Sequence, residues 1–210
     1  MATGPFKDIV NSLAELRAIV GEPAERSVKK ETATLDRYAR EFIAHSPFVL
    51  IATAGGNGRC DVSPKGGAPG FVAVLDDTHL VIPERPGNRR LDGMQNILQN
   101  DHVGLIFMIP GREDTLRVNG RACIVRDEAL LDRLTYADKR PQLAIGVAVE
   151  ECFFHCAKAF RRAGLWDSRT WPAPDIVASF AQMLHDRTKA PGTVEQLACD
   201  IEERTRAMLY

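Results

Sequence analysis

The stretch PGNRRLDGMQNILQNDHVGLIF, residues 86–107, passes from a turn into a helix and then into a strand. A Pro-Gly turn comes first, Asn88 is suited to a helix N-cap, and apolar residues recur at helical spacing up to about residue 100. Arg89 and Arg90 then fall in the first helical turn. Exposed cations there oppose the helix dipole at a cost of about 0.3–1 kcal/mol each. A bound anion would explain why they are present.

Strand-like segments lie on both sides of this stretch. Before it, within 47–84, PFVLIATAGG and GRCDVSPKGG each end in glycines, and FVAVLDD and HLVIPE are typical of a hairpin. After it, within 102–154, come HVGLIFMIPG, TLRVNGRACIVR, a short helix DEALLDRL and LAIGVAVEECFF. Six or seven strands interrupted by single helices predict a mainly β fold of the α+β class, an antiparallel barrel with peripheral helices.

Helices are predicted at both ends of this barrel. Residues 8–20 and 28–45 carry apolar side chains at helical spacing, and two further helices follow the PAP at 172–174. We therefore expect a single domain over 1–210, with N-terminal helices over 1–45, a barrel core over 47–166 and a C-terminal helical appendage over 172–210.

Composition limits the class of protein. The chain has 210 residues, 45% of them hydrophobic, and a formal net charge of −1. This charge gives no general attraction to nucleic acid or to an anionic membrane. No apolar run approaches the roughly 20 residues that cross a bilayer, and the N-terminus lacks the features of a secretory signal. We expect a cytoplasmic protein that binds neither nucleic acid nor membrane.

The five cysteines form an odd set with no CxxC pair. This pattern favours free thiols in a reducing compartment. Cys152, His155 and Cys156 offer three zinc ligands, but a structural zinc site takes four and no second cluster is visible. No metal is predicted.

The arginines after the FVAVLDD–HLVIPE hairpin favour a phosphate site. Gly87 lets the backbone come close to a ligand, and arginine forks beside free helix amides bind phosphate well. The alternative is a solvated basic surface in which arginines pair with Glu84 and Asp92. No basic stripe with interleaved aromatics extends from the site, so one phosphate is expected rather than a polyanion. The predicted ligands are Arg85, Arg89 and Arg90.

Two further segments carry candidate ligands. In DVSPKGG, Ser63 and Lys65 precede a glycine pair, and neighbouring strands of a small barrel can bring Lys65 close to the arginines. In FFHCAKAFRRAGLW, residues 153–166, the cations lie toward the end of a short helix, where the dipole favours them, so a structural role competes with ligand binding. The chain has no GxSxG, HExxH, P-loop or GxGxxG motif. A bound cofactor is therefore expected to carry the chemistry.

These residues resemble the FMN-binding split-barrel family, the pyridoxamine 5′-phosphate oxidase-like flavoproteins. The similarity covers about residues 47–166, and its most specific part is PGNRRLDGMQNILQNDHVGLIF followed by TLRVNGRA. It implies an FMN-binding split β-barrel with Greek-key antiparallel strands. Asn88, Arg89 and Arg90 match the family's trio at the FMN phosphate, and Lys65 matches its strand-end lysine.

The segment HCAKAFRRAGLW resembles the tail of a bacterial subgroup of these flavoproteins. In that subgroup the flavin lies at a dimer interface and the second subunit contributes contacts, which implies a homodimer here. The resemblance places near the isoalloxazine ring the four residues His155, Lys158, Arg162 and Trp166, and it offers Ser63 and Arg117 as hydrogen-bond partners of the ring or ribityl chain.

The resemblance does not extend to the substrate. The family's second basic residue is usually Lys, whereas here it is Arg90, and the C-terminal Arg and Trp pattern of true pyridoxamine phosphate oxidases is not recognisable. The leading hypothesis is an FMN-dependent oxidoreductase acting on a small molecule, with His155 as the candidate for proton transfer. The alternatives are a non-catalytic flavin-binding sensor or carrier, and a haem-binding split-barrel protein with His155 or His102 as axial ligand.

Overall fold

The computed structural model describes residues 4–210, which divide into two compact units, 4–31 and 32–210. The first unit holds α1 (Leu13–Val20) and α2 (Glu25–Lys29), neither of which has a buried residue. The helix predicted from residue 8 begins only at Leu13, because the Ser12 side chain caps it there. That all 210 residues form a single domain stays a prediction.

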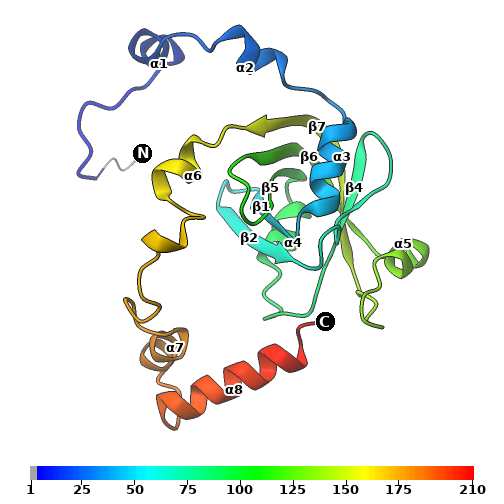
Figure 1. Cartoon of the computed structure of the whole chain (residues 1–210), viewed down its shortest axis with the longest axis vertical. Helices are drawn as coiled ribbons and strands as arrows, with labels where there is room; N and C mark the ends of the chain where they lie inside the picture. Colours follow the sequence, from blue (N-terminus) through cyan, green and yellow to red (C-terminus); the bar gives the residue numbers. More distant parts are fainter. Residues whose placement is uncertain (1–3) are drawn as a thin grey trace. The chain divides into compact units, whose positions relative to one another are not determined.

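The second unit is built on a seven-stranded antiparallel sheet, whose strands run from cyan to yellow in Figure 1. Its strand order is β2-β1-β5-β6-β7-β4-β3. The predicted split-barrel fold of the α+β class is confirmed, and the sheet is not closed: within residues 4–210, β2 and β3 are its two edges. The strands are β1 (Phe48–Ala54), β2 (Cys60–Gly66), β3 (Ala73–Val74), β4 (His79–Pro83), β5 (His102–Met108), β6 (Thr115–Val125) and β7 (Ala144–His155).

Alternate residues of the strands form the core. β1 and β5 bury every second side chain, as expected for strands with one face against the interior. The inward side chains Val49, Leu105, Phe107, Leu116 and Val118 are fully buried. Their neighbours in the sequence face the other side of the sheet, which matters for the site described below.

The helix predicted over 28–45 is wrong in its extent. Residues between α2 and α3 (Arg37–His45) leave the helix, because Thr32 exchanges backbone hydrogen bonds with Cys152 at 3.0 and 2.7 Å. Asp36 then caps a new helix by accepting from the Ala39 N–H at 2.8 Å. The other helices of this unit are α4 (Asp92–Ile97), α5 (Glu128–Arg133), α6 (Lys158–Ala163), α7 (Phe180–Thr188) and α8 (Val194–Ala207), with a 3₁₀ turn at Ser168–Thr170.

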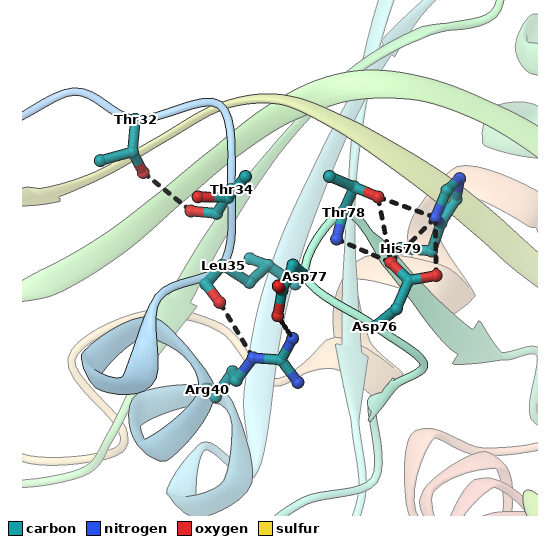
Figure 2. Close-up of polar contacts among 8 residues, drawn as sticks. All are labelled: Thr32, Thr34, Leu35, Arg40, Asp76, Asp77, Thr78 and His79. Carbon is teal, nitrogen blue, oxygen red and sulfur yellow. Dashed lines mark hydrogen bonds and ion pairs between the residues drawn. The ribbon is translucent and has the colours of Figure 1, made fainter.

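Figure 2 shows how the β3–β4 turn is fixed to the segment that leads into α3. The Leu35 N–H donates to the Asp77 carbonyl at 2.7 Å. Arg40 bridges the same two residues, since its Nε donates to the Leu35 carbonyl at 2.9 Å and its guanidinium pairs with the Asp77 carboxylate. These contacts join α3 to one edge of the sheet.

Within that turn the Asp76 carboxylate is held by its neighbours (Figure 2). It accepts from the Thr78 N–H at 2.7 Å, and the His79 Nδ1 lies 3.0 Å from both of its oxygens. The Thr78 N–H, and then His79, lower the pKa of Asp76 to about 2. The charged form is therefore the one that the folded turn favours.

The Asp76 turn should give the fold a measurable pH dependence. A carboxyl whose pKa is lower in the folded state stabilises the fold above its unfolded pKa and loses that contribution as pH falls through the folded pKa. The window therefore runs from about pH 4, the usual Asp value, to about pH 2. We expect the melting temperature of the wild type to approach that of Asp76→Asn across this window. Asp175→Asn, at an exposed position, is the control; a gap that stays constant for Asp76→Asn would contradict the assignment.

Candidate cofactor site

The basic loop lies between β4 and α4, and its helix begins later than predicted. Leu91, not Asn88, is the residue before α4, and its φ is 56°. The Asn88 side chain instead accepts from the Arg90 N–H at 3.0 Å and forms a turn. Arg89 and Arg90 therefore precede the helix, and the first helical turn carries an acidic residue. The expectation that the two arginines oppose the helix dipole is wrong.

The backbone of this loop is strained at two residues that are not glycine. Arg89 has a φ of 61° and Leu91 a φ of 56°. Left-handed conformations cost such residues roughly 1–2 kcal/mol each, and they cluster at sites that bind ligands. The Asn88 turn and a bond from Gln95 Nε2 to the Arg90 carbonyl, 2.7 Å, hold the loop in place. Both arginine side chains stay exposed.

Lys65 reaches the root of this loop from β2. Its ammonium pairs with the carboxylate of Glu84, the residue that follows β4, and the two side chains are only 20% and 19% exposed. Two residues earlier on β2, the Ser63 hydroxyl donates to Asp61 Oδ2 at 2.9 Å. Lys65 thus contacts Glu84, the residue directly before the segment that carries the arginines.

Arg90 has its own carboxylate partner. Its Nε and Nη2 donate to the two oxygens of Asp92 at 2.7 and 3.3 Å. Asp92, and more weakly Asp61, raise the pKa of Arg90. The carboxylates Glu84, Asp61 and Asp92 were not among the predicted site residues. Glu84 and Asp92 were visible in the sequence only as ion-pair partners of the arginines, and Glu84 in fact pairs with Lys65.

Arg85 points to a different part of the unit. Its Nη1 and Nη2 donate to the carbonyls of Lys139 and Leu134 at 3.1 and 2.8 Å. Its guanidinium carbon lies 5.7 Å from the ring centre of Tyr210, which packs on Tyr136 at 4.6 Å. Burial lowers the pKa of Arg85. In this structure Arg85 anchors the connection between α5 and β7, and its phosphate contact stays a prediction.

The outward face of the sheet carries Arg117. Residues directly opposite in antiparallel strands share a face, and Arg117 stands opposite Ile106 and Phe153. Its guanidinium carbon lies 5.5 Å from the Phe153 ring centre. Two rows of outward residues cross five strands: Pro64, Leu50, Ile106, Arg117 and Phe153, and beside them Val62, Ala52, Gly104, Asn119 and Glu151.

The predicted tail residues follow β7 and pack on the turn between β5 and β6. Trp166 Nε1 donates to the Arg112 carbonyl at 2.7 Å, and its ring stacks on Phe160 at 5.9 Å. Arg161, which was not a predicted ligand, pairs with Glu113 at 2.6 Å. The other predicted residues of this group are Lys158 and Arg162, exposed on α6, and His155, the last residue of β7, whose ring centre lies 5.0 Å from that of Phe153.

The basic loop and the tail belong to opposite ends of β7. The Glu84 N–H donates to the Leu143 carbonyl at 3.0 Å, immediately before β7 begins. His155 ends the strand after 12 residues, so at about 3.3 Å per residue its first and last residues lie about 36 Å apart along the strand. The structure therefore brings Lys65 to the loop root, and it places the tail at the far end of the strand.

Among residues 4–210, no three His, Cys, Asp or Glu side chains are grouped so as to hold a metal ion. Cys152 is buried, and burial raises the pKa of its thiol to about 11, which disfavours the thiolate. No helix in the described part of the chain has the length and hydrophobicity to cross a membrane.

Comparison with known proteins gives one family and several similar folds. The sequence profile of the family described as pyridoxamine 5′-phosphate oxidase matches residues 35–156. HupZ of Group A Streptococcus is 20% identical with a TM-score of 0.46, over 55% of this chain and 89% of that one. An FMN-binding protein of Syntrophomonas wolfei is 13% identical with a TM-score of 0.46, over 69% and 97%. A Clostridium acetobutylicum protein related to general stress protein 26 is 16% identical with a TM-score of 0.41, over 56% and 85%. The curated proteins include no match.

The contacts of Arg85 predict a structural effect that needs no ligand. Arg85→Ala removes two charge-assisted bonds to backbone carbonyls and should lower the free energy of unfolding by about 1–3 kcal/mol. Arg89→Ala, at an exposed position of the same loop, is the matched control and should change it by less than about 0.5 kcal/mol. Urea denaturation of the ligand-free protein measures both. Equal effects would show that Arg85 is not an anchor.

Proposed function

The chain belongs to the pyridoxamine 5′-phosphate oxidase family, whose profile covers more than half of it, and we propose that it is an FMN-dependent oxidoreductase acting on a small molecule. The family resemblance drawn from the sequence is confirmed. The observation that carries the proposal is the strained basic loop, in which Arg89 and Arg90 are exposed and Lys65 stands at the root.

The residues of this loop fit a phosphate group. Two guanidiniums offer planar donor forks and Lys65 offers a compact ammonium, which together suit a phosphate with several acceptor oxygens. The left-handed backbone at Arg89 and Leu91 is maintained by a bond from the Arg90 N–H to Asn88 within the loop and by a bond from Gln95 of α4 to the Arg90 carbonyl. A site of this shape can receive a phosphate without first being ordered by it.

The remaining residues keep the roles that the resemblance to the family suggests. Bound FMN would supply hydride transfer, while the protein supplies orientation and electrostatics. Lys65, Arg89 and Arg90 would hold the phosphate, and Ser63 and Arg117 are the candidates for the ring or ribityl chain. The strand register puts these two candidates on opposite faces of the sheet of one chain, Ser63 opposite the buried Ile51 and Arg117 opposite Ile106. His155 at the end of β7 moves a proton, because an imidazole titrates near neutral pH. Asn88 shapes the loop through its bond to Arg90.

A homodimer is part of this proposal. The outward face of the sheet presents Leu50, Ile106 and Phe153 over several strands, with Arg117 among them, and Val62 at its edge is 59% exposed. An apolar surface of this kind is typical of an interface. A two-fold dimer through it would let the tail of one chain complete the site that the loop of the other begins. Cytoplasmic location stays a prediction.

The cofactor proposal predicts a yellow protein that releases FMN, not FAD, on denaturation. Arg89→Ala combined with Arg90→Ala should weaken FMN binding about a hundredfold or more, because charge-assisted hydrogen bonds contribute about 1.5–3 kcal/mol each. Riboflavin, which has no phosphate, should bind the variant and the wild type equally. Quenching of flavin fluorescence measures both ligands.

Arg204→Ala with Arg206→Ala on α8 is the control for removing two exposed arginines. A colourless protein that cannot be reconstituted with FMN would overturn the cofactor, and a Soret band would point to haem instead. Failure of NADH, NADPH and a deazaflavin donor to reduce the bound flavin would favour the carrier alternative over an enzyme.

A mixed dimer tests whether two chains share each site. One chain carries Arg89→Ala with Arg90→Ala, and the other carries Lys158→Ala with Trp166→Ala. If each site combines the loop of one chain with the tail of the other, the heterodimer holds one site with both defects and one site with none. Differently tagged chains, coexpressed and purified as the heterodimer, should then bind about one FMN per dimer tightly. A heterodimer without any tight site would confine each site to one chain and remove the tail residues from it.

A further inference from the structure

Two of the cations proposed to bind the phosphate are already paired with carboxylates. Lys65 is paired with Glu84, and Arg90 with Asp92. Asp61 acts on Arg90 as well, by charge attraction. Lys65 and Arg90 each have a carboxylate partner that offsets the charge on the cation.

The two ion pairs differ in how strongly water screens the attraction between their charges. Arg90 and Asp92 are 71% and 42% exposed, and water screens a pair of that kind strongly. Lys65 and Glu84 are about 20% exposed, so their mutual attraction is screened less. Glu84 is also fixed at its backbone, because its N–H donates to the Leu143 carbonyl at 3.0 Å. The ion pair with Lys65 can therefore open by rotation of the Glu84 side chain, while the Glu84 backbone stays in place.

A phosphate that binds Lys65 must therefore compete with Glu84. If the carboxylate stayed in place, it would repel the incoming anion at close range. If it moves, the protein loses one ion pair for each that it gains. In both cases the free energy of binding a bare anion is reduced. A ligand with further contacts, such as a ring and a sugar chain, still binds.

Resting on the function proposed above, we infer that Glu84 is an internal counter-ion of the phosphate site: it occupies Lys65 and keeps free inorganic anions out, so that only a phosphate carried by a larger molecule binds tightly. Glu84 is thus a residue that sets specificity. It acts through Lys65 and touches no reacting atom.

The variant Glu84→Gln tests this inference. It keeps the size of the side chain and a carbonyl oxygen toward Lys65 but removes the competing charge. We expect inorganic phosphate to bind the ligand-free variant about three- to tenfold more tightly than the wild type, as removal of a partly screened charge implies. FMN should also bind more tightly, riboflavin should not, and added phosphate should displace FMN from the variant at lower concentration.

Glu84→Asp, whose shorter side chain draws the carboxylate back from Lys65, should give an intermediate affinity for phosphate. Glu202→Gln, which removes a carboxylate from an ion pair on α8, should leave every affinity unchanged. Isothermal titration with inorganic phosphate and fluorescence titration with the two flavins measure these effects. A gain in affinity is a readout that loss of structure does not produce.

The outcomes separate the two proposals. Weaker or unchanged binding of phosphate by Glu84→Gln would overturn the inference; weaker binding would show that Glu84 positions Lys65 for the phosphate instead. If the wild type and the variants bind no FMN but Glu84→Gln still gains affinity for phosphate, the counter-ion stands and the flavin proposal fails.

Discussion

The pairing of β6 with β7 is the interaction on which the rest of the second unit depends. β5, β1 and β2 join the sheet on one side of this pair, and β4 and β3 on the other. A bulge between Asn119 and Gly120 interrupts the register. A Cβ on Gly120 would lie 2.0 Å from the Ala148 carbonyl oxygen, so only glycine allows the two strands to approach there. Bulges increase local twist, and a strongly twisted sheet can bring Lys65 of β2 to Glu84 beyond β4.

Strand β7 of this pair also separates the two groups of residues that the proposed flavin site combines, the basic loop and the tail. Glu84, before the basic loop, is hydrogen-bonded to Leu143 just before β7 begins, and the tail follows the end of β7. The length of β7 therefore keeps the two groups apart within one chain. Its outward residues, with those of β6 and β5, form a face that has Phe153 and Arg117 in one row. A second copy placed on that face supplies a physical route by which loop and tail meet, which is why we couple the flavin proposal to a dimer.

Local patterns in the sequence were enough for the strands, because alternation along a strand reflects which face is buried. These patterns gave wrong helix boundaries where the same residues could form either a helix or another hydrogen-bonded structure. Asn88 reads as an N-cap, but the same side chain serves a turn equally well and bonds Arg90 instead. The helix predicted over 28–45 is interrupted because Thr32 pairs with Cys152, far along the chain. The contact of Lys65 with Glu84 depends on how the sheet twists, which no local pattern contains.

The loop combines a fixed shape with a neutralised charge. Its left-handed residues are held by hydrogen bonds made by the side chains of Asn88 and Gln95, so contacts within the protein help to offset the strain. A preformed site avoids the cost of ordering a loop on binding. If its cations had no carboxylate partners, such a site would also bind free inorganic anions, which would then compete with the ligand. Carboxylates at Lys65 and Arg90 remove that advantage for small ions while leaving the geometry intact. Under the proposed function, affinity would then depend on the parts of the ligand beyond its phosphate, and the outward face and the tail would be the elements that select it.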